Sequence, residues 1–141
     1  MKNKEYKAYV ESVIQTGREK GALVPGYVNE EDISLYYSAA DAVILPYKVF
    51  FSSSGPLSLA FAHEKPVILS SALKDYFLSD DFVQGLKESK TQQTDMIFQP
   101  RELSKVVETV ISETDKYVHF SSAMKQLRSW DSIAKQYLEV L

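Results

Sequence analysis

A run of small hydroxyl residues precedes a proline near the middle of the chain, in the segment Ser52-Ser53-Ser54-Gly55-Pro56. The proline predicts a helix that begins at this residue or just before it. The first amides of a helix have no partners within the helix, and the helix dipole adds partial positive charge there. The segment could therefore hold a phosphate or a diphosphate. The candidate donors are the N–H groups of Gly55, Leu57 and Ser58, together with the serine hydroxyls of Ser53 and Ser54.

A second interpretation of the same residues needs no ligand. Serine is a preferred residue at the position before a helix, where its side-chain oxygen accepts a hydrogen bond from a backbone N–H of the first turn. Ser54 could serve only as such a cap. From local chemistry alone, we favour the capping interpretation over the phosphate cradle.

The hydropathy pattern predicts alternating strands and helices that would position this loop. Continuous apolar runs stopped by proline or serine are typical of strands that are buried on both faces of a parallel sheet. Strands are predicted at residues 22–28, 41–46, 66–70 and 94–98; helices are predicted from the N-terminal region to Gly17 or Gly21, then over residues 29–40, 56–62, 101–113 and 127–141. Ligands bind such folds at the carboxyl ends of the strands, so the turn after Leu45 is a predicted site.

Composition excludes several classes of function. The 141 residues suit one soluble domain, expected in the cytoplasm, and the net charge of -3, with both signs interspersed, argues against nucleic-acid binding. No cysteine is present, and the two histidines, His63 and His119, are not spaced as ligands, so we predict no metal site. No apolar run approaches the ~20 residues of a transmembrane helix.

Four landmarks in order resemble the C-terminal domain of family 4-type glycosyltransferases. They are Gly26-Tyr27-Val28 with the acidic helix that follows, Ala39-Ala40-Asp41 with the apolar strand that ends at Pro46, the stretch Ala60–Ile68 that ends in Pro-Val-Ile, and Trp130-Asp131-Ser132-Ile133-Ala134 in a final helix. The resemblance covers nearly the whole chain. It implies a Rossmann-like three-layer α/β/α fold with a mostly parallel sheet, as a single partial GT-B C-terminal domain over residues 1–141.

The resemblance also implies a ligand and a set of site residues. The ligand would be a nucleotide sugar such as UDP- or GDP-hexose, which is a donor substrate; no cofactor is implied. Its diphosphate would lie at Ser53, Ser54, Gly55, Leu57 and Ser58; its nucleobase and ribose near Gly26, Tyr27 and Leu59; and its sugar near Tyr47, Phe51 and Ser52.

The chain departs from the family in three ways. The two loop glutamates usual in that family fall on Phe51 and Leu59, which cannot accept a hydrogen bond through their side chains. The glycine that usually precedes the Pro-Val-Ile strand is Glu64. The first two strands of the domain, with the loop that bears the usual donor-phosphate Arg and Lys, and the acceptor domain are absent from the sequence.

Those absences lead to an expectation about partners. The first strands normally occupy the middle of a doubly wound sheet, so their loss would expose an apolar strand edge that invites pairing with another chain. We expect a rearranged sheet, a homo-oligomer, or a separate chain that supplies the missing half. Two other functions stay open: a non-catalytic relic or oligomeric assembly module with this fold, and a flavodoxin-like binding or signalling domain, which we rank last.

Overall fold

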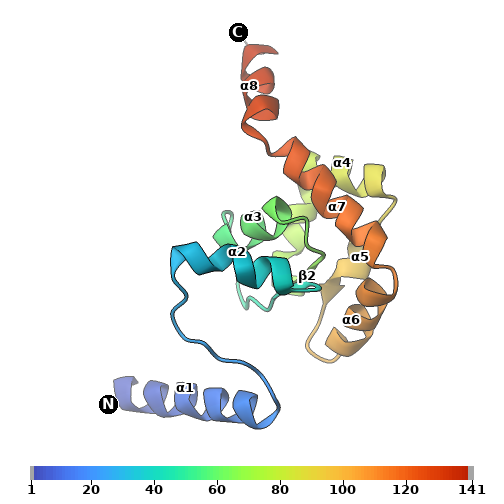
Figure 1. Cartoon of the computed structure of the whole chain (residues 1–141). Helices are drawn as coiled ribbons and strands as arrows, with labels where there is room; N and C mark the ends of the chain where they lie inside the picture. The colour runs from blue at the N-terminus through green and yellow to red at the C-terminus, as the bar shows by residue number, and fades with distance from the viewer. Residues whose placement is uncertain (1, 140–141) are drawn as a thin grey trace. The chain divides into compact units, whose positions relative to one another are not determined.

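The computed structural model describes residues 2–139, so that Met1 and residues 140–141, the ends of the predicted domain, lie outside the described residues (Figure 1). The backbone contacts divide the chain into two compact units that meet between Ile33 and Ser34. We describe each unit by itself, and the single domain expected from the sequence stays a prediction.

The first unit consists of helix α1 (Lys2–Glu19), an irregular segment, and the first residues of α2 (Glu30–Ala39). The strand predicted at residues 22–28 is wrong, because this stretch has no strand structure. Gly21 and Gly26 both adopt left-handed backbone angles, with φ of 86° and 77°, which turn the chain on either side of the apolar residues. A strand also needs a neighbour for its backbone groups, and none pairs with it among the described residues.

The second unit is a mixed, helix-rich domain with a small, open, parallel sheet. Its strands are β1 (Val43–Leu45), β2 (Val67–Ser70) and β3 (Ile97–Phe98), and their order in the sheet follows the chain. Val43 pairs with Val67, and Leu69 pairs with Ile97. All residues of β2 are buried, as its continuous apolar run predicts for a central parallel strand.

Helices make up most of the remainder of this unit. After the end of α2 they are α3 (Gly55–Ala62), the 3₁₀ segment η1 (Ser71–Leu78), α4 (Asp80–Ser89), the single turn α5 (Gln93–Met96), α6 (Leu103–Ser112), α7 (Thr114–Leu127) and α8 (Trp130–Glu139). Helices α3 and α4 both pack on α7, whereas α5 and α6 pack on each other and on β2 and β3 (Figure 1).

An aromatic cluster forms the core between α3, α4 and α7. The rings of Phe61, Phe82 and Phe120, one from each helix, lie 5.8 to 6.0 Å apart in edge-to-face and tilted contacts. Tyr76 stacks on Phe82 from η1. Gly85 lets α4 approach α7 closely, because a Cβ there would lie 2.7 Å from the sulfur of Met124. This packing fixes the ends of α3, and therefore the loop that precedes it.

Strand β1 is an edge strand of the sheet among the described residues. It pairs only with β2 among the described residues. Ile44, in the middle of the strand, is 40% exposed, although its neighbour Leu45 is buried. The sheet thus ends in a short apolar strand with one side uncovered.

Two further predictions differ from the structure, the first of them only in part. The strand predicted at residues 94–98 contains only β3, because Gln92 and Asp95 form a capping box that starts the helical turn α5 before the strand. The helical spacing of Trp130 predicts packing in a core, but Trp130 begins α8 and is 85% exposed, since α8 extends beyond the end of α7 (Figure 1). No helix among residues 2–139 is both long enough and apolar enough to cross a membrane.

Candidate functional site

The loop between β1 and α3 leaves the sheet at the carboxyl end of β1, where the sequence predicted a site. Side-chain hydroxyls anchor the loop at both ends. Ser70, at the end of β2, donates a hydrogen bond to the backbone oxygen of Tyr47 (2.6 Å), and Tyr76 donates to the backbone oxygen of Phe51 (2.5 Å). Tyr37, from the end of α2, donates to the backbone oxygen of Pro56 (3.1 Å). The loop is therefore tied to three other elements of the second unit.

Burial affects the chemistry of two of these anchors. It raises the pKa of Tyr37 above its ordinary value, and the nearby Tyr47 adds to that rise. Burial also raises the pKa of Tyr76, with Arg128 opposing the rise and Tyr47 adding to it. Both phenols are therefore neutral donors at physiological pH.

Ser54 is the helix cap that its type and position suggested. Its side chain is buried, and its Oγ accepts a hydrogen bond from the N–H of Leu57 at 3.3 Å. The backbone oxygen of Ser54 accepts from the N–H of Ser58 at 3.0 Å. Two of the three amides predicted as anion donors are therefore already engaged within the protein, as the capping interpretation requires.

Gly55 is the donor that remains. Its N–H makes no hydrogen bond among the described residues, and a Cβ placed on it would meet nothing within 4 Å. Space is therefore open beside the first residue of α3, where the helix dipole favours an anion. Ser52 and Ser53, both exposed, precede it, and Lys48 is the cationic residue of the loop.

The structure brings together only part of the predicted site. Tyr47 lies beside Ser54, with their hydroxyl oxygens 3.4 Å apart, and the ring of Phe51 packs edge-on against Tyr47 with centroids 5.7 Å apart. Ser58 instead lines a hollow with Phe61, Ala62, Lys125 and Arg128, on the side of α3 that faces α7.

The predicted nucleobase and ribose residues fall in different parts of the chain. Leu59 is half-buried within α3. Gly26 and Tyr27 belong to the first unit, where Gly26 turns the chain and the side chain of Tyr27 is exposed.

Sequence reasoning missed the residues that anchor the loop. Ser70 had a usable signal, because it ends a predicted parallel strand, and strand ends gather at one rim of the sheet. Tyr37 and Tyr76 had none, since each reaches the loop through a tertiary contact that helical spacing cannot reveal.

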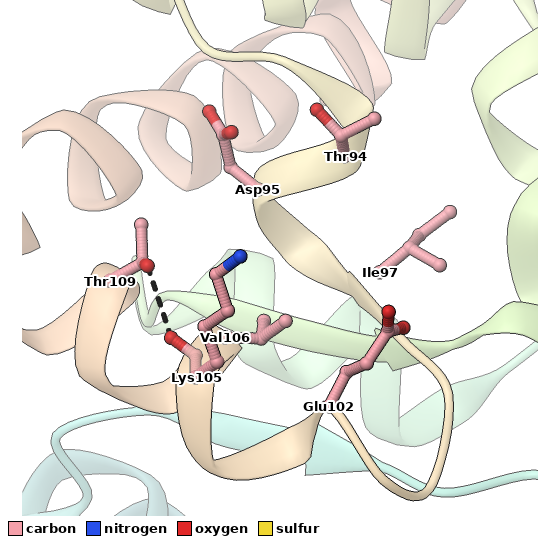
Figure 2. A pocket seen from close by; sticks show the side chains of 7 residues that line it. All are labelled: Thr94, Asp95, Ile97, Glu102, Lys105, Val106 and Thr109. Atoms are coloured by element: carbon pink, nitrogen blue, oxygen red, sulfur yellow. Dashed lines mark hydrogen bonds between the residues drawn. The ribbon is translucent and has the colours of Figure 1, made fainter.

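A second hollow, which the sequence did not predict, lies between α5 and α6 and has a volume of about 290 Å³ (Figure 2). Thr94 and Asp95 border it from α5, and Lys105 and Thr109 border it from α6. Glu102, at the residue before α6, borders it as well. The residues come from two helices separated by a strand, so their spacing in the sequence gives no motif.

Comparisons with known proteins give no relative: no family model, no curated protein and no solved structure matches the chain.

Proposed function

We propose that this chain binds the diphosphate of a nucleotide sugar at the start of α3, as the donor-binding part of a glycosyltransferase. The observation that carries the proposal is the open side of Gly55, whose free N–H sits at the start of a helix and at the carboxyl end of a parallel strand. The family resemblance in the sequence supports the same assignment. The proposal includes a Rossmann-like three-layer arrangement for the complete, partnered domain.

In the proposed complex each group has a role of its own. The N–H of Gly55 and the hydroxyl of Ser53 donate to phosphate oxygens, and Lys48 supplies the opposing charge. Tyr47 and Phe51 offer an aromatic face for the sugar. In a transfer reaction these donors would stabilise the diphosphate as it leaves, which is the step at which its negative charge grows.

One pair of variants isolates the amide that the proposal needs. Gly55→Pro removes the N–H yet suits the first position of a helix, and Ser54 already has the extended backbone that a following proline requires, with φ of -133° and ψ of 107°. Gly55→Ala keeps the N–H and adds a methyl group to open space.

Isothermal titration with UDP and GDP tests the proposal. We expect the unsubstituted protein and Gly55→Ala to bind at least one of the two nucleotides, and Gly55→Pro to bind it at least about tenfold more weakly, as for the loss of a charge-assisted hydrogen bond. The absence of binding to the unsubstituted protein at millimolar nucleotide, or equal binding by the proline variant, would refute it.

An assembly module is the second candidate, and the exposed edge of β1 favours it. The 40% exposure of Ile44 leaves an apolar side chain on a strand with free backbone groups, which is a template for pairing with another chain. The partner in this proposal is a second copy or a separate chain that pairs with this edge.

Light scattering after size exclusion distinguishes this candidate. We expect the unsubstituted chain to elute as a multiple of its 16.0 kDa mass and Ile44→Lys to elute as a monomer, because a charge on an edge strand blocks edge pairing. A monomeric unsubstituted protein would show that the edge is not used for self-assembly.

A further inference from the structure

The hollow between α5 and α6 combines opposite charges that do not neutralise one another. Figure 2 shows the ammonium group of Lys105 pointing into the space toward α5, with Asp95 and Glu102 on either side of it. No carboxylate oxygen lies within 4 Å of the Lys105 nitrogen among residues 2–139. A cation and two anions therefore face the same small volume without forming an ion pair across it.

The two carboxylates are only weakly engaged elsewhere. Asp95 lies 3.5 Å from the ammonium of Lys116, which is closer to Glu113, at 3.2 Å. Asp95 and Glu102 each accept one long hydrogen bond, of 3.3 Å, from a backbone N–H of the loop before their own helix. Each carboxylate keeps acceptor capacity for a ligand.

A buried group beside Asp95 is also incompletely satisfied. Tyr117 is fully buried in α7, and its hydroxyl makes no hydrogen bond among the described residues. Burial raises the pKa of this phenol, and the negative charge of Asp95 raises it further. A buried hydroxyl without a partner is uncommon in folded proteins. Tyr117 does not line the hollow, so the acceptor capacity available to a ligand there is that of Asp95 and Glu102.

The aliphatic residues that line the hollow favour a ligand with an apolar segment between its charged ends. Ile97 from β3 and Val106 from α6 add aliphatic surface to the lining, and Thr94 adds a hydroxyl. The lining carries one positive and two negative side chains: Lys105, Asp95 and Glu102. A simple anion would meet a net negative lining, whereas a simple cation would leave Lys105 without a counterion.

We propose that this hollow binds a small zwitterion, with its amine on Glu102 and its carboxylate on Lys105. The aliphatic chain between the two charges would lie on Ile97 and Val106. This site is separate from the proposed diphosphate site, and neither depends on the other.

A matched series of three small molecules tests the proposal on the full chain. The probes are 4-aminobutyrate, butylamine and butyrate, which share a four-carbon chain and carry both charges, the positive charge or the negative charge. Amide chemical shifts in α5 and α6 would be followed by NMR during titration. We expect 4-aminobutyrate to bind at least about tenfold more tightly than either single-charge probe, because only it pairs with both kinds of side chain.

Two variants assign the contacts, and a third is the control. Lys105→Gln should weaken 4-aminobutyrate binding about tenfold and leave butylamine unaffected. Glu102→Gln keeps the oxygen that accepts from Gln99 but loses the charge, so it should weaken both amines. Lys87→Gln, on an exposed position of α4, should change nothing. Equal binding of butylamine and 4-aminobutyrate, an unchanged affinity in Lys105→Gln, or no shifts in α5 and α6 at tens of millimolar probe would each overturn the proposal.

Discussion

Helices α3 and α4 pack on the same helix, α7. They differ in whether their glycine and the polar groups at their start contact other parts of the protein. Both end in the same way: Glu64 and Lys90 adopt left-handed angles, and the N–H of the residue that follows each of them bonds back into the helix, to Ala60 and Leu86. Their glycines differ. Gly85 of α4 is buried against Met124, whereas Gly55 of α3 faces open space.

The starts of the two helices repeat this difference. At the start of α4, Asp81 binds the guanidinium of Arg128 at 2.6 Å, and that guanidinium lies over the rings of Phe61 and Phe82. At the start of α3, the N–H of Gly55 has no such partner. We infer that α4 serves the stability of the domain, whereas the start of α3 is available for binding.

The largest expected effect comes from removing the ring of Phe82, at the centre of the aromatic core that α4 forms with α3 and α7. Phe82→Ala should lower the free energy of unfolding by about 3–5 kcal/mol, because it leaves a cavity among four aromatic neighbours. Urea denaturation would measure it. Val83→Ala, at an exposed position of the same helix, is the control and should change stability by less than about 1 kcal/mol. Similar losses in both variants would mean that α4 does not pack as described.

The two glycines give the most direct comparison. Gly85→Ala should cost about 1–3 kcal/mol, because its Cβ would lie 2.7 Å from the Met124 sulfur and 3.2 Å from the Phe120 ring. Gly55→Ala should cost less than about 1 kcal/mol, since its Cβ meets nothing beyond its chain neighbours, and only Pro56 disfavours a side chain before it. Thermal unfolding of the two variants side by side measures this, and a loss at position 55 as large as that at 85 would show that the start of α3 is closed.

The ion pair at the start of α4 predicts a dependence on pH. Burial alone would raise the pKa of Asp81, but hydrogen bonds from Ser79 and Arg128 and the charge of Arg128 lower it below its ordinary value. Stability from this carboxylate is therefore present above its unfolded pKa of ~3.9 and is lost as the pH falls through the lower folded value. Asp81→Asn should lose about 1–2 kcal/mol at pH 7.

Denaturation at a series of pH values checks this sign. The difference in unfolding free energy between the unsubstituted protein and Asp81→Asn should shrink as the pH falls below about 4. A difference that stays constant down to pH 2 would show that the charge of Asp81 is not stabilising.

The smallest effects are expected at the two helix ends. Lys90→Gly should raise stability by about 0.5–1 kcal/mol, because glycine adopts left-handed angles without the strain of a side chain. Glu64→Gly gains the same relief but loses the 2.7 Å pair with Lys125, which is worth about 0.2–1 kcal/mol at this exposure, so its net effect should be near zero. Adding Lys125→Ala to the Lys90→Gly and Glu64→Gly variants separates the relief of backbone strain from the loss of the ion pair. The added substitution should lower stability only in the variant that retains Glu64.

Local chemistry predicted the fold where local rules decide the structure. The strands at Val43 and Val67 and the helix after Gly55 follow from apolar runs, proline and a serine cap. The resemblance in the sequence predicts a glycine before the Pro-Val-Ile strand, where this chain has Glu64. That expectation has a physical reason, because Glu64 adopts left-handed backbone angles, at which glycine is favoured.

The rest depended on contacts between distant residues. The apolar stretch at residues 22–28 has the composition of a strand, but strand structure also needs a partner. Trp130 has helical spacing, but its burial would need a surface to cover it. The sequence predicted the cap at Ser54 and a helix that starts near Gly55, whereas Tyr76 and the charges around Lys105 are brought into place only by the packing of separate helices.

The order of the strands has a consequence for synthesis of the protein. Because β1, β2 and β3 are neighbours in the sheet in the same order as in the chain, each can join the sheet as soon as it leaves the ribosome. The strand that emerges first, β1, is also one of the two edge strands of the sheet among the described residues, and its Ile44 is exposed. Nascent chains on neighbouring ribosomes of one messenger RNA would therefore expose the same apolar strand edge before synthesis is complete. The yield of folded protein would depend on how quickly that edge pairs with its proper partner.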